Sequence, residues 1–225
     1  SLWEAAGGWS ADLDVDSNIP IGAGLSSSAA LCVAIVMCSQ NSVDPMEISL
    51  EAQRIENHVL RSNCGLMDQI SVTHSKEGLA TLLDFSKMSI ESFRMPDDWR
   101  FKLVDTGIRR SLSETNYSSS EIKIETRRIH AKEESARVRA ALSSDARVLG
   151  TILNESHASI SDNIRASTPE IDNMVKEIQS TAGVLGARLM GGGFGGMILA
   201  LVEEEDTLPG ELLVSSAPAF LQETL

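Results

Sequence analysis

The sequence carries too few basic residues for a protein that binds nucleic acid. Its 19 lysines and arginines stand against 32 aspartates and glutamates, so the formal net charge is −13 at pH 7. A surface that binds nucleic acid normally shows a basic patch or stripe. The charge balance therefore argues against nucleic acid as a partner, and it says nothing specific about a small substrate.

Long apolar runs and disulfide frameworks are also missing. No stretch approaches the roughly 20 apolar residues that cross a membrane, and the N-terminal residues lack the basic-then-apolar pattern of a targeting segment. The three cysteines, Cys32, Cys38 and Cys64, are an odd number without framework spacing. We therefore expect a cytoplasmic protein with reduced thiols and no membrane partner, in which Cys32 and Cys38 are core residues of an apolar segment.

Internal repeats, low-complexity tracts and clusters of Cys and His at metal-binding spacing are absent as well. What remains is the composition of a soluble globular protein, with 42% hydrophobic and 23% charged residues. A chain of 225 residues can form one large or two ordinary domains. The polar break Met95-Pro96-Asp97-Asp98 predicts a boundary between a domain of residues 1–96 and a domain of residues 97–225.

The most informative stretch is the loop Gly22-Ala23-Gly24-Leu25-Ser26-Ser27-Ser28. The alternating residues Asp12–Asp16 before it predict a half-buried strand, and the apolar residues Ala29–Ser39 after it predict a buried helix. The glycines let the backbone approach a ligand, the helix N-terminus suits a phosphate, and the serines can cap the helix or bind a metal on the phosphate. An ordinary capped helix explains the same residues. A P-loop is excluded because the Gly-Lys-Ser/Thr ending is missing.

Two carboxylates further along the chain can also be interpreted either as structural residues or as functional ones. The pair Asp44-Pro45 predicts a helix start, and Glu56 lies beside the apolar stripe of that helix, where a carboxylate is usually a rim residue. Asp68 follows Gly65 in the first turn of a short helix, where the helix dipole favours a negative charge. Its apolar neighbours indicate a partly enclosed position, and an enclosed carboxylate could bind a substrate hydroxyl.

The C-terminal half contains a strand over Phe101–Asp105, a hydroxyl-rich loop with the single tyrosine, Tyr117, and three helical segments. A lone tyrosine in such a loop is either a surface residue or part of a site. The glycine-rich segment Gly186–Val202 matches the spacing of a dinucleotide-binding loop. However, strand-like runs flank it on both sides and no helix follows, so it predicts a hairpin loop instead.

Three separated stretches, Pro20–Ala30, Cys64–Gln69 and Gly186–Val202, resemble the second motif, the catalytic segment and the third motif of the GHMP sugar-kinase superfamily. The sequence Cys-Gly-Leu-Met-Asp-Gln at 64–69 is similar to galactokinases in particular, as are Arg109–Tyr117 and Asn154–Ser159. The resemblance implies a two-domain α+β fold: an N-terminal GHMP kinase domain and a ferredoxin-like C-terminal domain, with the active site between them.

The resemblance also implies roles for individual residues. The Gly22–Ser28 loop would wrap the phosphates of ATP, and Ser28, or else Ser27, would hold Mg²⁺ together with Glu56. Asp68 would face the anomeric hydroxyl of the sugar, while Gly65 and Tyr117 would contact the sugar. These residue types suit phosphoryl transfer, which chiefly needs positioning, charge neutralisation and a carboxylate at the nucleophile.

The first motif of the family, with a catalytic arginine and a Gly-Glu-His-Thr-Asp sugar clamp, does not occur in these 225 residues. Two functions follow as hypotheses: an ATP-dependent sugar 1-kinase acting on galactose or a related sugar such as arabinose or a uronic acid, and a catalytically weak relative that binds nucleotide or sugar as a regulator. For this stretch alone the resemblance predicts little galactokinase activity and self-association through an unpaired sheet edge, whereas a complete protein would be a monomer.

Overall fold

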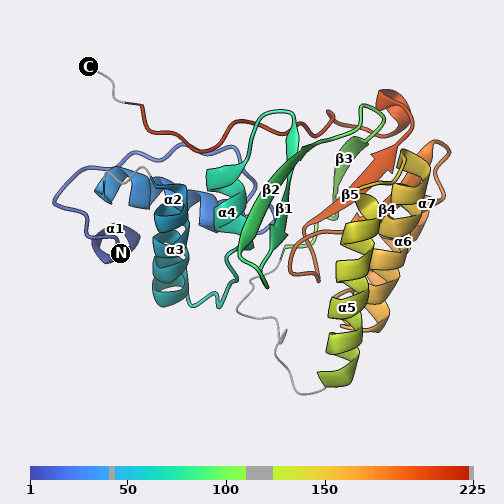
Figure 1. Cartoon of the computed structure of the whole chain (residues 1–225), viewed down its shortest axis with the longest axis horizontal. Coiled ribbons are helices and arrows are strands. Elements are labelled where there is room, and N and C mark those ends of the chain that lie inside the picture. Colours follow the sequence, from blue (N-terminus) through green and yellow to red (C-terminus); the bar gives the residue numbers. More distant parts are fainter. Residues whose placement is uncertain (41–43, 110–123, 223–225) are drawn as a thin grey trace. The chain divides into compact units, whose positions relative to one another are not determined.

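The computed structural model describes residues 1–40, 44–109 and 124–222 (Figure 1). The chain divides into two compact units. Unit 1 contains Ser1–Pro20, Ser26–Met95 and Ser215–Leu225, and unit 2 contains Ile21–Leu25 and Pro96–Val214. Each unit is therefore built from segments that are distant in sequence. The division into domains 1–96 and 97–225 stays a prediction.

Unit 1 contains a helical core. Its helices are α1 (Leu2–Ala5), α2 (Ser27–Gln40), α3 (Pro45–Ile55), the π-helix η1 (Glu56–Leu60) and α4 (Met67–His74). The predicted start of α3 is confirmed, since Asp44 Oδ1 accepts hydrogen bonds from the N–H groups of Met46 and Glu47 at 3.0 and 2.8 Å. Apolar residues of α2 and α3, with Ala6 directly after α1, form the buried centre: Ala6, Cys32, Val33, Val36, Ile48, Ala52 and Ile55.

Two predictions for unit 1 are wrong. Residues Asp12–Asp16 do not form a strand, and Leu13 and Val15 are 50% and 62% exposed. A strand needs hydrogen bonds to a neighbouring strand, and within the described ranges no segment pairs with these residues. Cys38 is exposed rather than part of the core, because the buried face of α2 passes through Cys32, Val33 and Val36.

The remaining regular structure of unit 1 is the hairpin of β1 (Leu79–Asp84) and β2 (Ser89–Arg94), an isolated antiparallel pair. The C-terminal segment joins this unit through the hydrogen bond from Ala219 N–H to the Val72 carbonyl at 2.9 Å. None of the helices within the described ranges combines the length and apolar character that crossing a bilayer requires.

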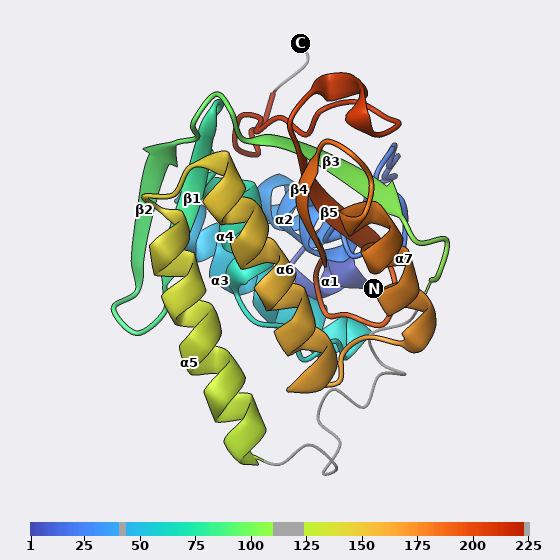
Figure 2. The same ribbon diagram turned by 90° about the vertical axis from the view of Figure 1, so that its right-hand side faces the viewer.

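Unit 2 contains a three-stranded antiparallel sheet with helices packed on it. The strands β3 (Arg100–Asp105), β4 (Val184–Leu189) and β5 (Met197–Val202) are arranged in the order β3-β5-β4. The helices are α5 (Ile124–Ala141), α6 (Ala146–Asp162) and α7 (Pro169–Gln179), followed by the short 3₁₀ turn η3 (Glu205–Thr207). Figure 2 shows α6 and α7 beside β4, and both helices pack against that strand. The predicted hairpin at 186–202 and the α+β class are confirmed.

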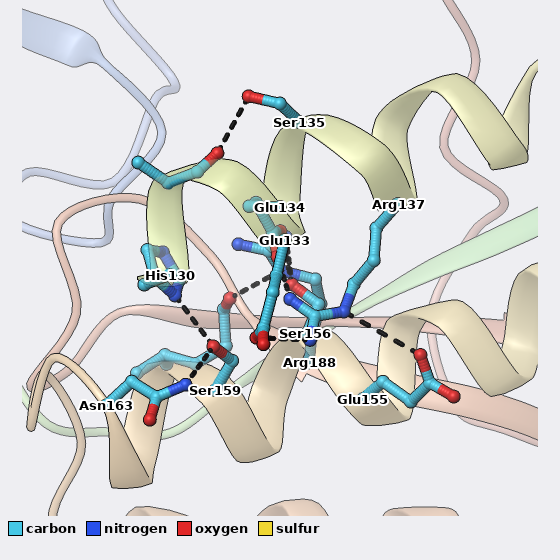
Figure 3. A network of polar contacts seen from close by, with 12 residues as sticks. His130, Glu133, Glu134, Ser135, Arg137, Glu155, Ser156, Ser159, Asn163 and Arg188 are labelled. Atoms are coloured by element: carbon cyan, nitrogen blue, oxygen red, sulfur yellow. Dashed lines mark hydrogen bonds and ion pairs between the residues drawn. The ribbon is translucent and has the colours of Figure 1, made fainter. Parts of the chain in front are cut away.

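Helix α5 has no buried residue and is held to unit 2 by polar contacts (Figure 3). Arg188 of β4 donates hydrogen bonds to Glu134 Oε1 and to Ser156 Oγ, both at 2.7 Å. Burial alone would raise the pKa of Glu134, but the hydrogen bond from Ser156 and the charge of Arg188 outweigh burial, and the pKa is lowered. Arg137 of α5 adds an ion pair to Glu134 at 3.0 Å. Hydrogen bonds and charges therefore take the place of an apolar face in this helix.

The packing of α6 on β4 depends on two glycines that lie opposite each other. A Cβ on Gly150 would overlap the carbonyl group of Leu185, and a Cβ on Gly186 would overlap the carbonyl group of Gly150. The backbones of the helix and the strand are therefore in direct contact, which brings Asn154 Oδ1 within 2.9 Å of the Ala187 N–H group that donates to it.

This contact yields a prediction for stability. Gly150→Ala should lower the free energy of unfolding by about 1–3 kcal/mol, because overlap with the Leu185 backbone outweighs the roughly 1 kcal/mol by which Ala favours a helix. Chemical denaturation measures the effect. Thr151→Ala, at the adjacent exposed position of α6, is the matched control and should be nearly neutral. Equal effects of the two substitutions would contradict the close contact.

Candidate functional site

The loop Ile21–Leu25 packs within unit 2 against the glycine turn between β4 and β5. Gly22 and Gly24 adopt φ angles of 71° and 73°, in the left-handed region that favours glycine. A Cβ on Gly196 would lie 2.5 Å from the Ala23 carbonyl oxygen, and a Cβ on Gly191 would lie 3.3 Å from the Gly24 carbonyl oxygen. The two glycine-rich segments that the sequence singled out are therefore backbone neighbours, and Ala23 between them is fully buried.

The loop leads into α2, whose first turn presents free hydrogen-bond donors. The Ser26 carbonyl accepts the first helical bond from Ala30 N–H at 3.0 Å. Among the described residues, no acceptor bonds the N–H groups of Ser27, Ser28 and Ala29, and the hydroxyls of Ser26 and Ser27 form no hydrogen bond. Such a helix start, with a partial positive charge and open N–H groups, suits an anionic group such as phosphate.

Glu56 is the most unusual residue near this turn, because its carboxylate is buried with an exposed fraction of only 2%. The expectation of a rim residue is therefore wrong. Ser28 Oγ donates a hydrogen bond to Glu56 Oε1 at 2.7 Å, and Gln69 Nε2 donates one to Glu56 Oε2, also at 2.7 Å. Glu56 is also the first residue of the π-helix η1, and single π-turns are frequent at functional sites.

The charge of Glu56 acts on the groups around it. Within the described part of the chain, no lysine, arginine or histidine forms an ion pair with this carboxylate. Burial raises the pKa of the Cys32 thiol to about 12, and the negative charge of Glu56 adds to the increase. Burial also raises the pKa of Cys64. Both thiols therefore stay protonated, and the carboxylate has no cationic partner among the described residues.

The donor set around Glu56 fits a magnesium ion that is carried in part by a phosphate. A carboxylate and a hydroxyl are hard oxygen ligands, and Mg²⁺ is usually bound through one or two carboxylates, waters and substrate phosphates. The described residues contain no group of three or more His, Cys, Asp or Glu that could bind a metal without such a phosphate. Ser28 and Glu56 are therefore suited to share a cation with a ligand at the α2 N-terminus.

The segment between η1 and α4 is fixed by side-chain hydrogen bonds to its backbone. Asn57 Oδ1 accepts from Cys64 N–H at 2.7 Å, and Asn57 Nδ2 donates to the Cys64 carbonyl at 3.2 Å. Gln53 Nε2 donates to the same carbonyl at 3.0 Å. These bonds hold the turn that precedes Gly65, which is exposed, and no atom of the described residues outside its chain neighbours lies within 4 Å of the position a Cβ would take. The approach to α4 is therefore ordered and open.

Asp68 lies in the first turn of α4, as predicted, and is half-buried. Leu66 precedes the helix without any side-chain capping bond, so Asp68 does not act as a cap. Its carboxylate forms no hydrogen bond or ion pair with another described residue. The side chain is thus available to a ligand, and the adjacent positive end of the helix dipole stabilises its charge.

The structure brings Ser28 and Glu56 into direct contact, and it places Gly22, Ala23 and Gly24 against the glycine turn. Tyr117, the other predicted sugar contact, lies outside the described residues. The sequence reasoning missed Gln69, which bonds Glu56. The sequence spacing of Leu66, Gln69, Ile70 and Thr73 is that of one helix face, which predicts that Gln69 points inward with the others. All four residues are buried.

Comparisons with protein families match both halves of the chain. Residues 2–76 match the model of the GHMP kinases N terminal domain, and residues 138–209 match the model of the GHMP kinases C terminal region. The first match contains the loop at 22–28, Glu56 and Asp68, and the second contains the glycine turn between β4 and β5.

Solved structures share the fold. The galactokinase of Lactococcus lactis, complexed with galactose, matches with a TM-score of 0.73 and 23% identity over 97% of this chain and 73% of that protein. A mevalonate kinase matches with a TM-score of 0.60 and 21% identity over 85% of this chain and 61% of its own. For the mevalonate kinase of Methanococcus jannaschii, the TM-score is 0.57 and the identity is 20% over 83% of this chain and 59% of that protein. The chain thus spans less than two thirds of the length of these mevalonate kinases.

Proposed function

This chain belongs to the GHMP kinase family, and from that premise we propose that it transfers a phosphoryl group from ATP to the anomeric hydroxyl of a sugar, with galactose as the first candidate. The observation that carries the proposal is the buried Glu56 carboxylate bonded to Ser28 at the open N-terminus of α2. A buried carboxylate without a cationic partner among the described residues is costly unless a ligand supplies the positive charge.

The phosphates of ATP would bind at the first turn of α2, where the N–H groups of Ser27, Ser28 and Ala29 are free to donate. The Gly22–Gly24 backbone, which the glycine turn supports, would cover the phosphate chain. Ser28 and Glu56 would hold Mg²⁺, which when bound neutralises charge on the phosphoryl oxygens. Within unit 1, Ser28 and Glu56 are already hydrogen-bonded to each other, so these two side chains need little ordering on binding.

Asp68 would act on the sugar. Its carboxylate has no bonding partner among the described residues, so one oxygen can accept a hydrogen bond from the anomeric hydroxyl and orient it for attack on the γ-phosphorus. As the bond from the sugar oxygen to the γ-phosphorus forms and the bond from that phosphorus to the bridging oxygen of the departing ADP breaks, the same Asp68 oxygen can take the hydroxyl proton. Gly65 and Tyr117 are proposed to contact the sugar as well.

Galactose is favoured over other acceptors by the match to the galactokinase structure, whose sequence and fold cover nearly the whole chain. The experiment is ADP release with Mg·ATP and a panel of galactose, arabinose, galacturonic acid and mevalonate. Phosphorylation of galactose at the anomeric position supports the proposal. Turnover of mevalonate alone would replace it, and nucleotide binding without turnover of any acceptor would support a regulatory role.

A substitution at Glu56 tests the cation site. Glu56→Gln keeps the shape of the side chain but removes its charge, so the affinity for Mg·ATP, measured by calorimetry, should fall at least about tenfold. The affinity for ATP in excess EDTA should change little, because the metal no longer contributes to either protein. Glu51→Gln, which removes a partly buried carboxylate from the preceding helix α3, is the control and should bind Mg·ATP normally. Unchanged affinity in Glu56→Gln would remove Glu56 from the cation site.

A further inference from the structure

Gln69 occupies a position where an apolar residue would be expected. Its side chain is fully buried on the inner face of α4, together with Leu66, Ile70 and Thr73. A buried amide is costly unless both of its polar atoms find partners. Here the oxygen Oε1 is buried and has no hydrogen-bond partner among the residues that the structure describes. The chain therefore retains a polar group at a core position where methionine would avoid that cost.

The orientation of this amide is set by its nitrogen. Nε2 donates a hydrogen bond of 2.7 Å to Glu56 Oε2 and a weaker one of 3.5 Å to Cys64 Sγ. Because Oε1 receives no hydrogen bond from a described residue, the charge-assisted bond to Glu56 is the strongest interaction that the structure gives this side chain. The position of the amide is therefore determined mainly by its hydrogen bond to the Glu56 carboxylate.

The two oxygens of Glu56 have different partners. Oε1 faces Ser28, on the first turn of α2, whose N–H groups are open, while Oε2 faces Gln69 in the core. A hydroxyl has two lone pairs besides its proton, so Ser28 Oγ can bind a cation through its oxygen while the proton still donates to Glu56 or to another acceptor. The bond from Gln69 does not have to change.

We propose that Gln69 is the positioning residue of the cation site: it holds Oε2 of Glu56 so that Oε1 stays directed at the ion shared with the nucleotide phosphates. This inference rests on the proposed function. Since Gln69 directly follows Asp68, the same bond also ties the first turn of α4 to Glu56, and one amide thereby fixes the metal ligand and the chain that carries the sugar-facing carboxylate.

Binding of Mn²⁺ in the presence of a non-hydrolysable ATP analogue tests the role, with electron paramagnetic resonance counting the free ion. Gln69→Met fills the same volume without the amide. It should weaken Mn²⁺ binding at least about tenfold, as loss of a hydrogen bond to a metal-ligating carboxylate typically does. Its melting temperature should change little, because the unpartnered Oε1 is removed together with the bond. Gln179→Met, which removes an amide-to-carbonyl hydrogen bond of 2.9 Å in unit 2, is the matched control and should bind Mn²⁺ normally.

Each outcome separates this inference from the proposed function. Equal Mn²⁺ affinity in the wild-type chain and Gln69→Met would overturn the role of Gln69 alone, while absence of Mn²⁺ binding in the wild type would overturn both. If Gln69→Met does not fold, the wild-type chain still gives an answer by nuclear magnetic resonance. The Gln69 side-chain amide protons should remain protected from exchange when Mg²⁺ and the analogue bind, and loss of that protection would contradict a bond that persists in the complex.

Discussion

Replacing Asp68 with asparagine should lower sugar-dependent ADP release at least about a hundredfold, the size of effect expected when a general base is removed. Asparagine has nearly the same shape and can still contact the sugar hydroxyl, but its amide cannot accept the proton. Because Asp68 forms no hydrogen bond or ion pair with the described residues, the substitution breaks no bond that holds α4. The substitution should therefore lower turnover strongly while the stability of the protein changes little.

The competing explanation is that Asp68 only stabilises the N-terminal end of α4. Loss of a charge at a helix N-terminus costs about 0.3–1 kcal/mol, which in a protein of this size lowers the melting temperature by no more than about 4 °C. Glu170→Gln, which removes a carboxylate from the first turn of α7, is the matched control and should leave turnover unchanged.

The measurement should be made on the 225-residue chain and, in parallel, on the chain preceded by a first motif of the family, because the transition-state arginine of that motif can itself be worth several orders of magnitude. If Asp68→Asn lowers turnover and melting temperature to the same extent as Glu170→Gln, Asp68 has only a structural role.

Much of the fold could be predicted because it depends on local signals. Asp44 and Pro45 mark the start of α3 by capping chemistry, and Thr168 and Pro169 mark the start of α7 in the same way. The glycine-rich segment at 186–202 predicts a hairpin because apolar strand-like runs flank it on both sides, and β4 and β5 pair there. In each of these cases the deciding residues lie within one turn of the feature that they determine.

The errors arose where a distant residue decides the outcome. Two apolar residues in alternation, Leu13 and Val15, do not make a strand without a partner, and the sequence pattern cannot supply one. The burial of Glu56 depends on Ser28 and Gln69, which are 28 and 13 residues away. Local spacing could only place Glu56 beside an apolar stripe, and the same limit concealed the role of Gln69.

Contact between the two glycine-rich segments also joins residues that are far apart in the sequence. Gly196→Ala should weaken binding of Mg·ATP roughly thirtyfold, the factor that about 2 kcal/mol of lost packing represents. A Cβ at this position would lie 2.5 Å from the Ala23 carbonyl oxygen and 3.2 Å from Gly24 N. Because both contacts are with backbone, neither can be relieved by a side-chain rotation, and the Gly22–Gly24 loop has to leave the glycine turn.

Gly196 also has a φ of 93°, which an alanine adopts only with strain, so the clash must be separated from the strain. Gly210→Ala provides that separation, because Gly210 lies in unit 2, has a φ of 88° and, within the described part of the chain, has no atom near its Cβ position at less than 4 Å. Both substitutions should lower the free energy of unfolding by about 1 kcal/mol through strain, but only Gly196→Ala should also weaken Mg·ATP binding in calorimetry. If the two variants bind the nucleotide equally well, the contact between the glycine turn and Ala23 is not needed for the Gly22–Gly24 loop to bind the nucleotide. A loss confined to Gly196→Ala would instead mean that the third motif acts on the nucleotide through the backbone of the second.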